Sequence, residues 1–248
     1  MRLSASCYAV VGLAYAPPWT ANAGFVVGAT TTLVIDTGPT ALAAATIHGY
    51  ASAVRPSNSL LVIDTERHLD HIGGNSFFHD RGVPILGHSG IARTDEERAA
   101  DIDEINALVP ERVRRERREA ALAYEGTRMV NPTRPIEHDC DLDLGDLSVR
   151  VLLTPGHTPT NLSVFVPGEG ALFTGDCVVA GYLPNLKAGG PEEWRTWLAS
   201  LERISALTPR LIVPGHGPVL RDAQVPTALA DVRRVLEDAI AEGRAPTQ

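Results

Sequence analysis

Residues 66 to 71 read Glu66-Arg67-His68-Leu69-Asp70-His71, and this stretch decides both the fold and the chemistry of the chain. Four of these six residues are potential metal ligands, and they follow the apolar segment 60–63, which is typical of a buried strand. Imidazole nitrogen and carboxylate oxygen are suitable ligands for zinc, iron or manganese. The stretch therefore predicts a metal site at the end of a strand.

Three more residues of ligand type follow downstream, each in a turn-rich stretch after a predicted strand. They are His157 in Thr154-Pro155-Gly156-His157-Thr158, Asp176 in Thr174-Gly175-Asp176, and His216 in Pro214-Gly215-His216-Gly217. A short run cannot surround a metal by itself, so ligands from other elements have to complete the site. Together the seven residues are sufficient for two metals, which can share a hydroxide when they lie about 3.5 to 4 Å apart.

This set of residues resembles the signature of the metallo-β-lactamase-fold hydrolases, which is His-x-His-x-Asp-His followed by a His, a bridging Asp and a last His. The resemblance covers nearly the whole chain, from Asn22 onward. It implies the α/β class and a four-layer αβ/βα sandwich, formed as a single domain over residues 1–248. It also implies that Glu66, His68 and His157 hold one metal, that Asp70, His71 and His216 hold the other, and that Asp176 bridges them.

Glu66 departs from the pattern of that family, which usually has His at this position. Three carboxylates with four imidazoles make a harder and more anionic site, which shifts the preference toward iron or manganese without excluding zinc. We expect two divalent metal ions, with zinc as the first choice and iron or manganese as alternatives. The other outcome is a weakened first site and a single tightly held metal.

The expected reaction is hydrolysis of an activated carbonyl by a metal-bound hydroxide that Asp70 orients. The bond cleaved is an ester, a thioester, a lactone or a β-lactam. Two other classes stay open, a mono-iron persulfide dioxygenase-like oxidoreductase and a non-catalytic metal-stabilised binding protein. Support for the ligands is expected from Thr65, Asp36 and Asn161.

The loop 181–190 follows the Asp176 turn and is expected to form one wall of the substrate pocket. Lys187, the only lysine in the chain, is a candidate for substrate contact in this loop. Tyr182 and Asn185 are candidates in the same loop. For each of them an ordinary surface role is the alternative.

Composition limits the partners that the protein can have. A chain of 248 residues with 44% hydrophobic residues can build one domain with a substantial core. The net charge of −8 argues against nucleic acid, which needs a concentrated basic surface. The sequence contains no run of eighteen apolar residues, so no membrane span is predicted. We expect a small-molecule substrate, with no nucleic acid and no membrane as partner, and leave a homo-oligomer open.

The N-terminal region allows two interpretations. The apolar stretch 5–16 and the following Ala21-Asn22-Ala23 imitate a signal peptide with its cleavage site. Polar residues dilute the stretch, so we interpret it as the first strand of the expected sheet. The expected location is the cytoplasm, with the periplasm or secretion not excluded.

Periodicity predicts the remaining elements. Strands are expected at 25–27, 32–36, 60–63, 84–86, 149–153, 162–166, 171–174 and 211–213, and helices at 39–54, from Pro191 onward and from Val225 onward. A helical insertion is expected around 94–130, and Thr94 with Glu97 forms a candidate capping box at its start. The Arg-rich stretch 112–118 within the insertion is interpreted as a solvated helix face, with a lid or dimer surface that attracts anionic substrates as the alternative.

Overall fold

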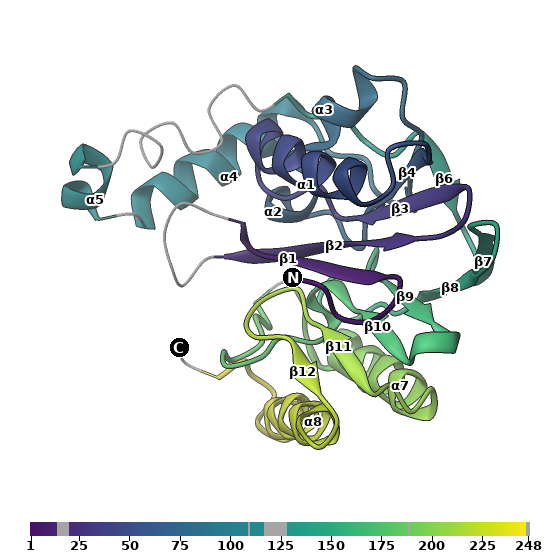
Figure 1. Cartoon of the computed structure of the whole chain (residues 1–248). Helices are drawn as coiled ribbons and strands as arrows, with labels where there is room; N and C mark the ends of the chain where they lie inside the picture. The colour runs from purple at the N-terminus through teal and green to yellow at the C-terminus, as the bar shows by residue number, and fades with distance from the viewer. Residues whose placement is uncertain (14–19, 109, 117–127, 188, 247–248) are drawn as a thin grey trace.

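Two six-stranded β-sheets face each other at the centre of the molecule (Figure 1). The computed structural model describes residues 1–13, 20–108, 110–116, 128–187 and 189–246. The first sheet has the order β1-β2-β3-β4-β5-β6 and the second the order β12-β11-β10-β9-β8-β7. Helices cover the outer face of each sheet, which confirms the expected four-layer αβ/βα sandwich.

The first sheet contains β1 (Cys7–Leu13), β2 (Ala21–Val27), β3 (Thr31–Ile35), β4 (Ser59–Ile63), β5 (Ile85–His88) and β6 (Arg134–Ile136). The second contains β7 (Cys140–Asp143), β8 (Ser148–Leu153), β9 (Leu162–Val166), β10 (Ala171–Phe173), β11 (Leu211–Val213) and β12 (Leu220–Arg221). Strands β3 to β6 run parallel to one another, as do β10 and β11, whereas the other neighbouring pairs are antiparallel.

Helices α1 (Ala41–Val54), α2 (Leu69–Ile72) and α3 (Asn75–His79) pack on the first sheet. Helices α7 (Pro191–Ala206) and α8 (Gln224–Glu242) pack on the second, and two single turns, η1 (Pro167–Glu169) and η2 (Gly175–Cys177), flank β10. None of the helices in the described part of the chain is long and apolar enough to cross a membrane.

Strands β2, β3, β9, β10 and β11 are buried on both faces because each sheet lies between its helices and the other sheet. In β3, Leu33 and Ile35 belong to the core between the two sheets, whereas Val34 packs on the outer side with Ile47 of α1. Phe173 of β10 reaches the inner core from the second sheet. A strand covered on both faces reads as a continuous apolar run, as β10 and β11 do.

The predicted insertion is present as α4 (Asp95–Leu108) and α5 (Glu111–Glu116), which extend away from the sheets (Figure 1). The capping box at its start is confirmed, because the amide of Thr94 donates to Glu97 Oε2 at 2.8 Å and the amide of Glu97 donates to Thr94 Oγ1 at 3.2 Å. In the Arg-rich stretch, Arg115 pairs with Glu111 and its side chain is 73% exposed. The side chain of Arg114 and residues 117–127 lie outside the described part of the chain.

Replacement of Leu33 by Ala tests the assignment of the core between the sheets. Leu33 is fully buried, so the loss of its side-chain atoms and the cavity that remains should lower the free energy of unfolding by about 2 to 5 kcal/mol. Leu42→Ala on the outer face of α1 is the matched control, because Leu42 is 73% exposed. Urea denaturation of both variants measures the difference, and equal effects would contradict the assigned core.

Candidate metal centre

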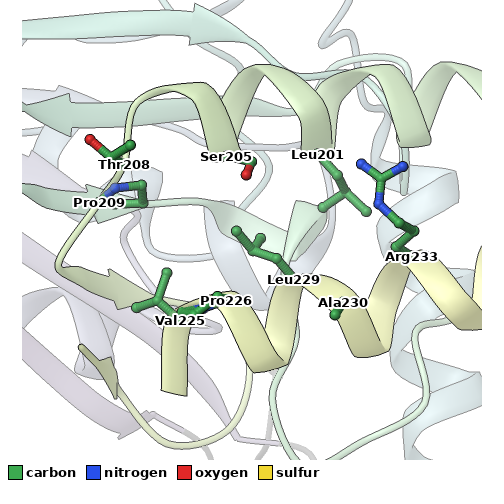
Figure 2. A pocket seen from close by; sticks show the side chains of 9 residues that line it. All are labelled: Leu201, Ser205, Thr208, Pro209, Val225, Pro226, Leu229, Ala230 and Arg233. Carbon is green, nitrogen blue, oxygen red and sulfur yellow. The ribbon is translucent and has the colours of Figure 1, made fainter. Parts of the chain in front are cut away.

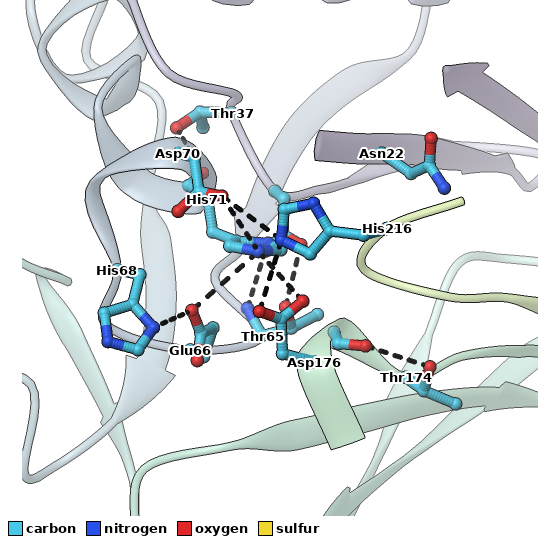
Figure 3. A network of polar contacts seen from close by, with 12 residues as sticks. Asn22, Thr37, Thr65, Glu66, His68, Asp70, His71, Thr174, Asp176 and His216 are labelled. Atoms are coloured by element: carbon cyan, nitrogen blue, oxygen red, sulfur yellow. Dashed lines mark hydrogen bonds and ion pairs between the residues drawn. The ribbon is translucent and has the colours of Figure 1, made fainter. Parts of the chain in front are cut away.

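All seven residues of ligand type lie in segments that follow strands, and these segments meet at one edge of the two sheets. Glu66 and His68 lie in the bend after β4, and Asp70 and His71 lie in α2, which follows directly. His157 follows β8, Asp176 lies in η2 after β10, and His216 follows β11. Figure 3 shows the side chains of Glu66, His68, Asp70, His71, Asp176 and His216 gathered around one point.

The seven side chains form two groups that could each hold a metal ion. In the first group, ligand atoms of Glu66, His68, His157 and Asp176 lie within 4.8 Å of one another, and in the second the same holds for Asp70, His71 and His216. Asp176 faces both groups, because its Oδ2 lies 3.5 Å from His157 Nε2 and 3.3 Å from His216 Nε2. The structure thus brings together the set that the sequence predicts. The binding of two metals by this set stays a prediction.

Glu66 occupies the place that the signature gives to its first His. Its side chain is fully buried, and its Oε1 lies 2.6 Å from Nδ1 of His68. Its Oε2 points toward His157, whose Nε2 is 3.8 Å away. The carboxylate therefore points into the first group. Glu in place of His at this position changes the proposed ligand atom from nitrogen to oxygen but keeps a side chain of ligand type.

Three buried atoms of this cluster have no hydrogen-bond partner among the described residues. They are Glu66 Oε2, His71 Nε2 and Asp176 Oδ1. A buried polar atom without a partner costs about 1 to 3 kcal/mol, and more when its group is charged. A cation between these atoms would satisfy them together. By chemistry and by position, the residues present fit a metal.

Asp36 orients His71 from behind. Its Oδ2 accepts a hydrogen bond from Nδ1 of His71 at 2.9 Å and another from Oγ1 of Thr65 at 2.7 Å, and its Oδ1 accepts from the amide of Thr65 at 2.7 Å. With Nδ1 engaged, Nε2 of His71 is directed into the cluster. Asp36 adopts a left-handed backbone with φ of 62°, a strained conformation that non-glycine residues tolerate where the surroundings impose it.

Main-chain carbonyls orient two further imidazoles in the same way. Nδ1 of His157 donates to the carbonyl of Asn185 at 3.1 Å, and Nδ1 of His216 donates to the carbonyl of Thr20 at 3.0 Å. In both rings Nε2 is left to face the cluster. Sequence reasoning missed these supports because any residue can supply a carbonyl.

Two features of the His216 segment were also missed. Asn22 is 4% exposed and its amide donates to the carbonyls of Pro214 and Gly217 at 2.9 and 2.8 Å, which fixes the turn that carries His216. At Gly215 a Cβ would lie 1.9 Å from Oδ1 of Asp176, so only glycine allows this close approach. A single Asn within a strand gives no sequence signal for such a role.

Asn161, which the sequence also predicts as a support, braces two ligand-bearing turns. Its amide donates to Oγ1 of Thr154 at 3.0 Å, at the start of the turn with His157. It also donates to the carbonyl of Thr174 at 3.0 Å, two residues before Asp176. The side chain thereby ties the ends of β8 and β10 together.

Opposite charges in the cluster shift the pKa of each partner. Burial alone would lower the pKa of His216, but Asp176 and Asp70 raise it to about 11. Burial also opposes the charge on His68, but Glu66 raises the pKa of that ring to about 9. Burial alone would raise the pKa of Asp176, whereas His216 and His71 hold it well below its usual range. In the metal-free chain, protons therefore occupy the imidazoles of His68 and His216 at neutral pH.

The three candidates for substrate contact lie in a loop that spans both groups. At one end, the amide of Ala180 donates to the carbonyl of His216 at 3.0 Å, and at the other the carbonyl of Asn185 holds His157. Between these points Tyr182 and Leu183 are 44% and 49% exposed. The side chains of Asn185 and Lys187 are exposed as well, and contact of Tyr182, Asn185 or Lys187 with a substrate stays a prediction.

A separate cavity of about 420 Å³ lies between α7 and α8 (Figure 2). Its lining is mostly apolar and includes Leu201, Val225 and Leu229, with Arg233 at one end. No residue of the metal-ligand set lines it. We therefore do not include this cavity in the candidate site.

The fold agrees with comparisons to known proteins. The family model of the metallo-beta-lactamase superfamily matches residues 16–216. A probable metallo-hydrolase of Bacillus subtilis, YqjP, is 27% identical over 83% of this chain and 72% of its own length. A hydroxyacylglutathione hydrolase of Hahella chejuensis is 38% identical over 29% of each chain. A solved metallo-beta-lactamase from Pontibacter korlensis superposes with a TM-score of 0.69 at 17% identity, covering 96% of this chain and 98% of its own.

The chain spans only part of several curated relatives. Two that are 34% and 35% identical match over 23% and 28% of their own length. The similarity of such relatives is confined to the segment that aligns.

Metal uptake should release protons at neutral pH. The pKa values of about 9 for His68 and about 11 for His216 mean that both rings are protonated at pH 7 in the metal-free chain, and a metal can bind only after these protons leave. As the pH rises through 9, His68 is already neutral before the metal arrives, so fewer protons are released. Calorimetric titration with Zn²⁺ in buffers of different ionisation enthalpy counts them.

The matched variants for this titration are His68→Gln and His138→Gln. His68→Gln should lower the number of protons released at pH 7, whereas the exposed His138 should leave it unchanged. Zinc binding without net proton release at pH 7 would contradict the assignment of these imidazoles.

Proposed function

Because the chain belongs to the metallo-beta-lactamase superfamily, we propose that it is a metal-dependent hydrolase that attacks an activated carbonyl of a small molecule. The observation that carries the proposal is the cluster of seven buried or half-buried ligand-type side chains, three of which hold a buried atom without a hydrogen-bond partner among the described residues. The relatives support the reaction class, since they include a probable metallo-hydrolase and a hydroxyacylglutathione hydrolase. The bond cleaved is an ester, a thioester, a lactone or a β-lactam.

When bound, two metal ions would lower the pKa of a water and polarise the carbonyl oxygen of the substrate. Zinc is our first choice for both, with iron or manganese as alternatives because Glu66 adds a third carboxylate. Glu66, His68 and His157 would hold the first, Asp70, His71 and His216 the second, and Asp176 both. No other residue of the chain has to supply a ligand.

Asp70 is proposed to manage the proton of the attacking water. Its side chain is 26% exposed, whereas that of Glu66 is fully buried, so Asp70 is the carboxylate that entering water can reach. His216 and His71 beside it keep its pKa low against the opposing effect of burial, so its carboxylate is ionised at neutral pH and can accept a hydrogen bond from water. A carboxylate in this position orients the water and can pass a proton to the leaving group.

The loop between Ala180 and Asn185 is proposed to supply substrate contacts. Because both of its ends are hydrogen-bonded to proposed ligands, the residues between them lie beside the metal centre. The exposed Tyr182 and Leu183 would cover an apolar part of the substrate. Lys187, which is exposed two residues after Asn185, would attract an anionic group.

Elemental analysis followed by a substrate panel tests the proposed reaction. We expect transition metal in stoichiometric amount and turnover of at least one of nitrocefin, a lactone, a thioester and an aryl ester. With metal at saturation, Asp70→Asn should lower kcat by roughly 100-fold or more, since acid–base groups typically contribute that much. Asp80→Asn is the matched control, because Asp80 is 58% exposed and pairs with Arg128.

Other results of the same panel identify the other classes. One iron per chain with sulfur-dependent oxygen uptake would favour the persulfide dioxygenase-like reaction. Stoichiometric metal without turnover on any substrate would favour a binding protein. Purified chain that contains no transition metal and gains none on reconstitution would refute all three.

Variants of the loop test which part of the substrate it contacts. Lys187→Met should raise KM about threefold to tenfold for anionic substrates and leave KM for neutral ones unchanged, because it removes one charge near the surface. Tyr182→Ala should raise KM mainly for substrates with a bulky apolar group, since about 1 to 2 kcal/mol of apolar contact is lost. Steady-state kinetics on matched substrate pairs measures both, and equal ratios for variant and wild type would exclude the contact concerned.

A further inference from the structure

The bend that carries Glu66 and His68 is held at three carbonyl groups. The carbonyl of Thr65 accepts from the amide of Leu162 at 2.5 Å, which ties the start of the bend to β9. The carbonyl of His68 accepts from the amides of His71 and Ile72 in α2, at 3.0 and 3.1 Å. Between them, the carbonyl of Arg67 accepts from Nη1 of Arg93 at 3.2 Å. Arg93 is thus a side chain that fixes the middle of the bend from outside it.

Arg93 is a buried cation. Its side chain is only 4% exposed, and a guanidinium removed from water costs several kcal/mol unless it is paired. Asp101 of α4 pairs with it, with Oδ2 at 2.7 Å from Nη2, and Glu97 lies 3.6 Å from its Nε. A buried ion pair is by itself weak evidence for a stabilising role. The role of Arg93 is therefore inferred from the groups that it contacts.

The main chain at Arg93 is fixed as firmly as its side chain. Its amide donates to Oδ1 of Asn131 at 2.8 Å, and its carbonyl accepts from Nδ2 of the same residue at 3.0 Å. The guanidinium therefore reaches the bend from a rigid base. Its Nη1 contacts the carbonyl of Arg67, and its Nη2 contacts the carboxylate of Asp101.

The start of α4 holds Arg67 a second time, through its side chain. Nη2 of Arg67 donates to Oε1 of Glu97 at 2.7 Å, and the other oxygen of Glu97 caps the helix at Thr94. The guanidinium of Arg67 is 35% exposed, so this outer contact is weaker than the buried one to its carbonyl. The two contacts together connect the helical insertion to the residue between two proposed ligands.

We propose that Arg93 is a positioning residue for the first metal group. By fixing the carbonyl of Arg67, it holds the residues on either side so that the carboxylate of Glu66 and the imidazole of His68 stay 2.6 Å apart and both face His157. Among the described residues, no hydrogen bond or ion pair of Arg93 reaches Asp70, His71 or His216 of the second group. This inference rests on the proposed metal centre. It assigns to the helical insertion a role in the metal affinity of the first group, which is one half of that centre.

Titration with Co²⁺ tests this role, because each bound cobalt ion is followed by its visible absorption in competition with a chelator. Arg93→Met keeps a long buried side chain but removes the donors to Arg67. We expect one cobalt ion to bind with wild-type affinity and the other about 10 to 100 times more weakly, the loss typical for outer partners of metal ligands. Arg55→Met is the matched control, because Arg55 donates to the carbonyl of Gly28 at 3.0 Å, far from the ligands in the fold.

Two more variants separate positioning from stability. Asp101→Asn removes the charged partner of Arg93 but leaves Nη1 of Arg93 to donate to the carbonyl of Arg67. The melting temperature should therefore fall, whereas both cobalt affinities should stay at the wild-type value. Arg93→Lys keeps the buried charge but replaces the rigid fork, in which Nη1 bonds the Arg67 carbonyl and Nη2 bonds Asp101, by a single nitrogen that the carboxylate of Asp101 attracts more strongly, so one cobalt ion should again bind more weakly. Arg93→Lys is the decisive variant if Arg93→Met does not fold.

The cobalt titrations have three possible results, and each leads to a different conclusion about Arg93 and the metal centre. Weakening of one cobalt ion in the Arg93 variants, with Arg55→Met unchanged, supports the positioning role. Two cobalt ions bound at wild-type affinity by a folded Arg93 variant, or two affinities that fall equally together with the melting temperature, would overturn it while leaving the metal centre intact. A wild-type chain that binds no cobalt would overturn the metal centre and this role together.

Discussion

Confinement of opposite charges in a small buried volume is the constraint on which the rest of the structure depends. Three carboxylates and four imidazoles share one edge of the sandwich, and most of them are shielded from water. No single segment could hold such a set, since like charges repel and each group loses its hydration. The two sheets meet this constraint by bringing ligand-type residues from four strand ends to one place, where every carboxylate lies beside a ring.

The fold and the site have to be understood together for this reason. The inner faces of the sheets form the apolar core that keeps β4 opposite β10 and β11, and their ends carry the ligands. Behind the ligands lies a layer of fixed acceptors, namely the carboxylate of Asp36 and the carbonyls of Thr20 and Asn185. The directions of the rings of His71, His157 and His216 are set by this layer before any metal arrives.

Much of this could be predicted from the sequence, because the ligands have distinctive side chains at distinctive spacings. Strands β9 and β11 were predicted at their observed bounds, and the helices on the second sheet followed from Trp194, Leu201 and Val225 at helical intervals. Strands β6, β7 and β12 were missed because none of them is a continuous apolar run, as the equally short β10 and β11 are. Strand β6 also contains a proline, and β7 alternates with aspartates.

The unpredicted part of the site has a common physical cause. Carbonyl groups at Thr20, Arg67 and Asn185 act through the main chain, which every residue possesses, so no letter of the sequence marks them. Arg93 and Asn22 do act through side chains, but their partners are these same unmarked groups or their neighbours. Only coordinates show that a buried arginine and a buried asparagine each fix a turn that carries ligands.

The support of His157 by a carbonyl has a consequence for how substrate preference could diverge among proteins of this kind. Because the ring depends on where the backbone of residue 185 lies and not on which side chain it bears, the exposed positions 182, 183, 185 and 187 are free to change in chemical character. An inserted or deleted residue would shift that backbone and turn the imidazole. The exposed side chains of this loop can therefore change during evolution. The length of the loop has to be kept, because it places the carbonyl that orients His157 in the proposed metal centre.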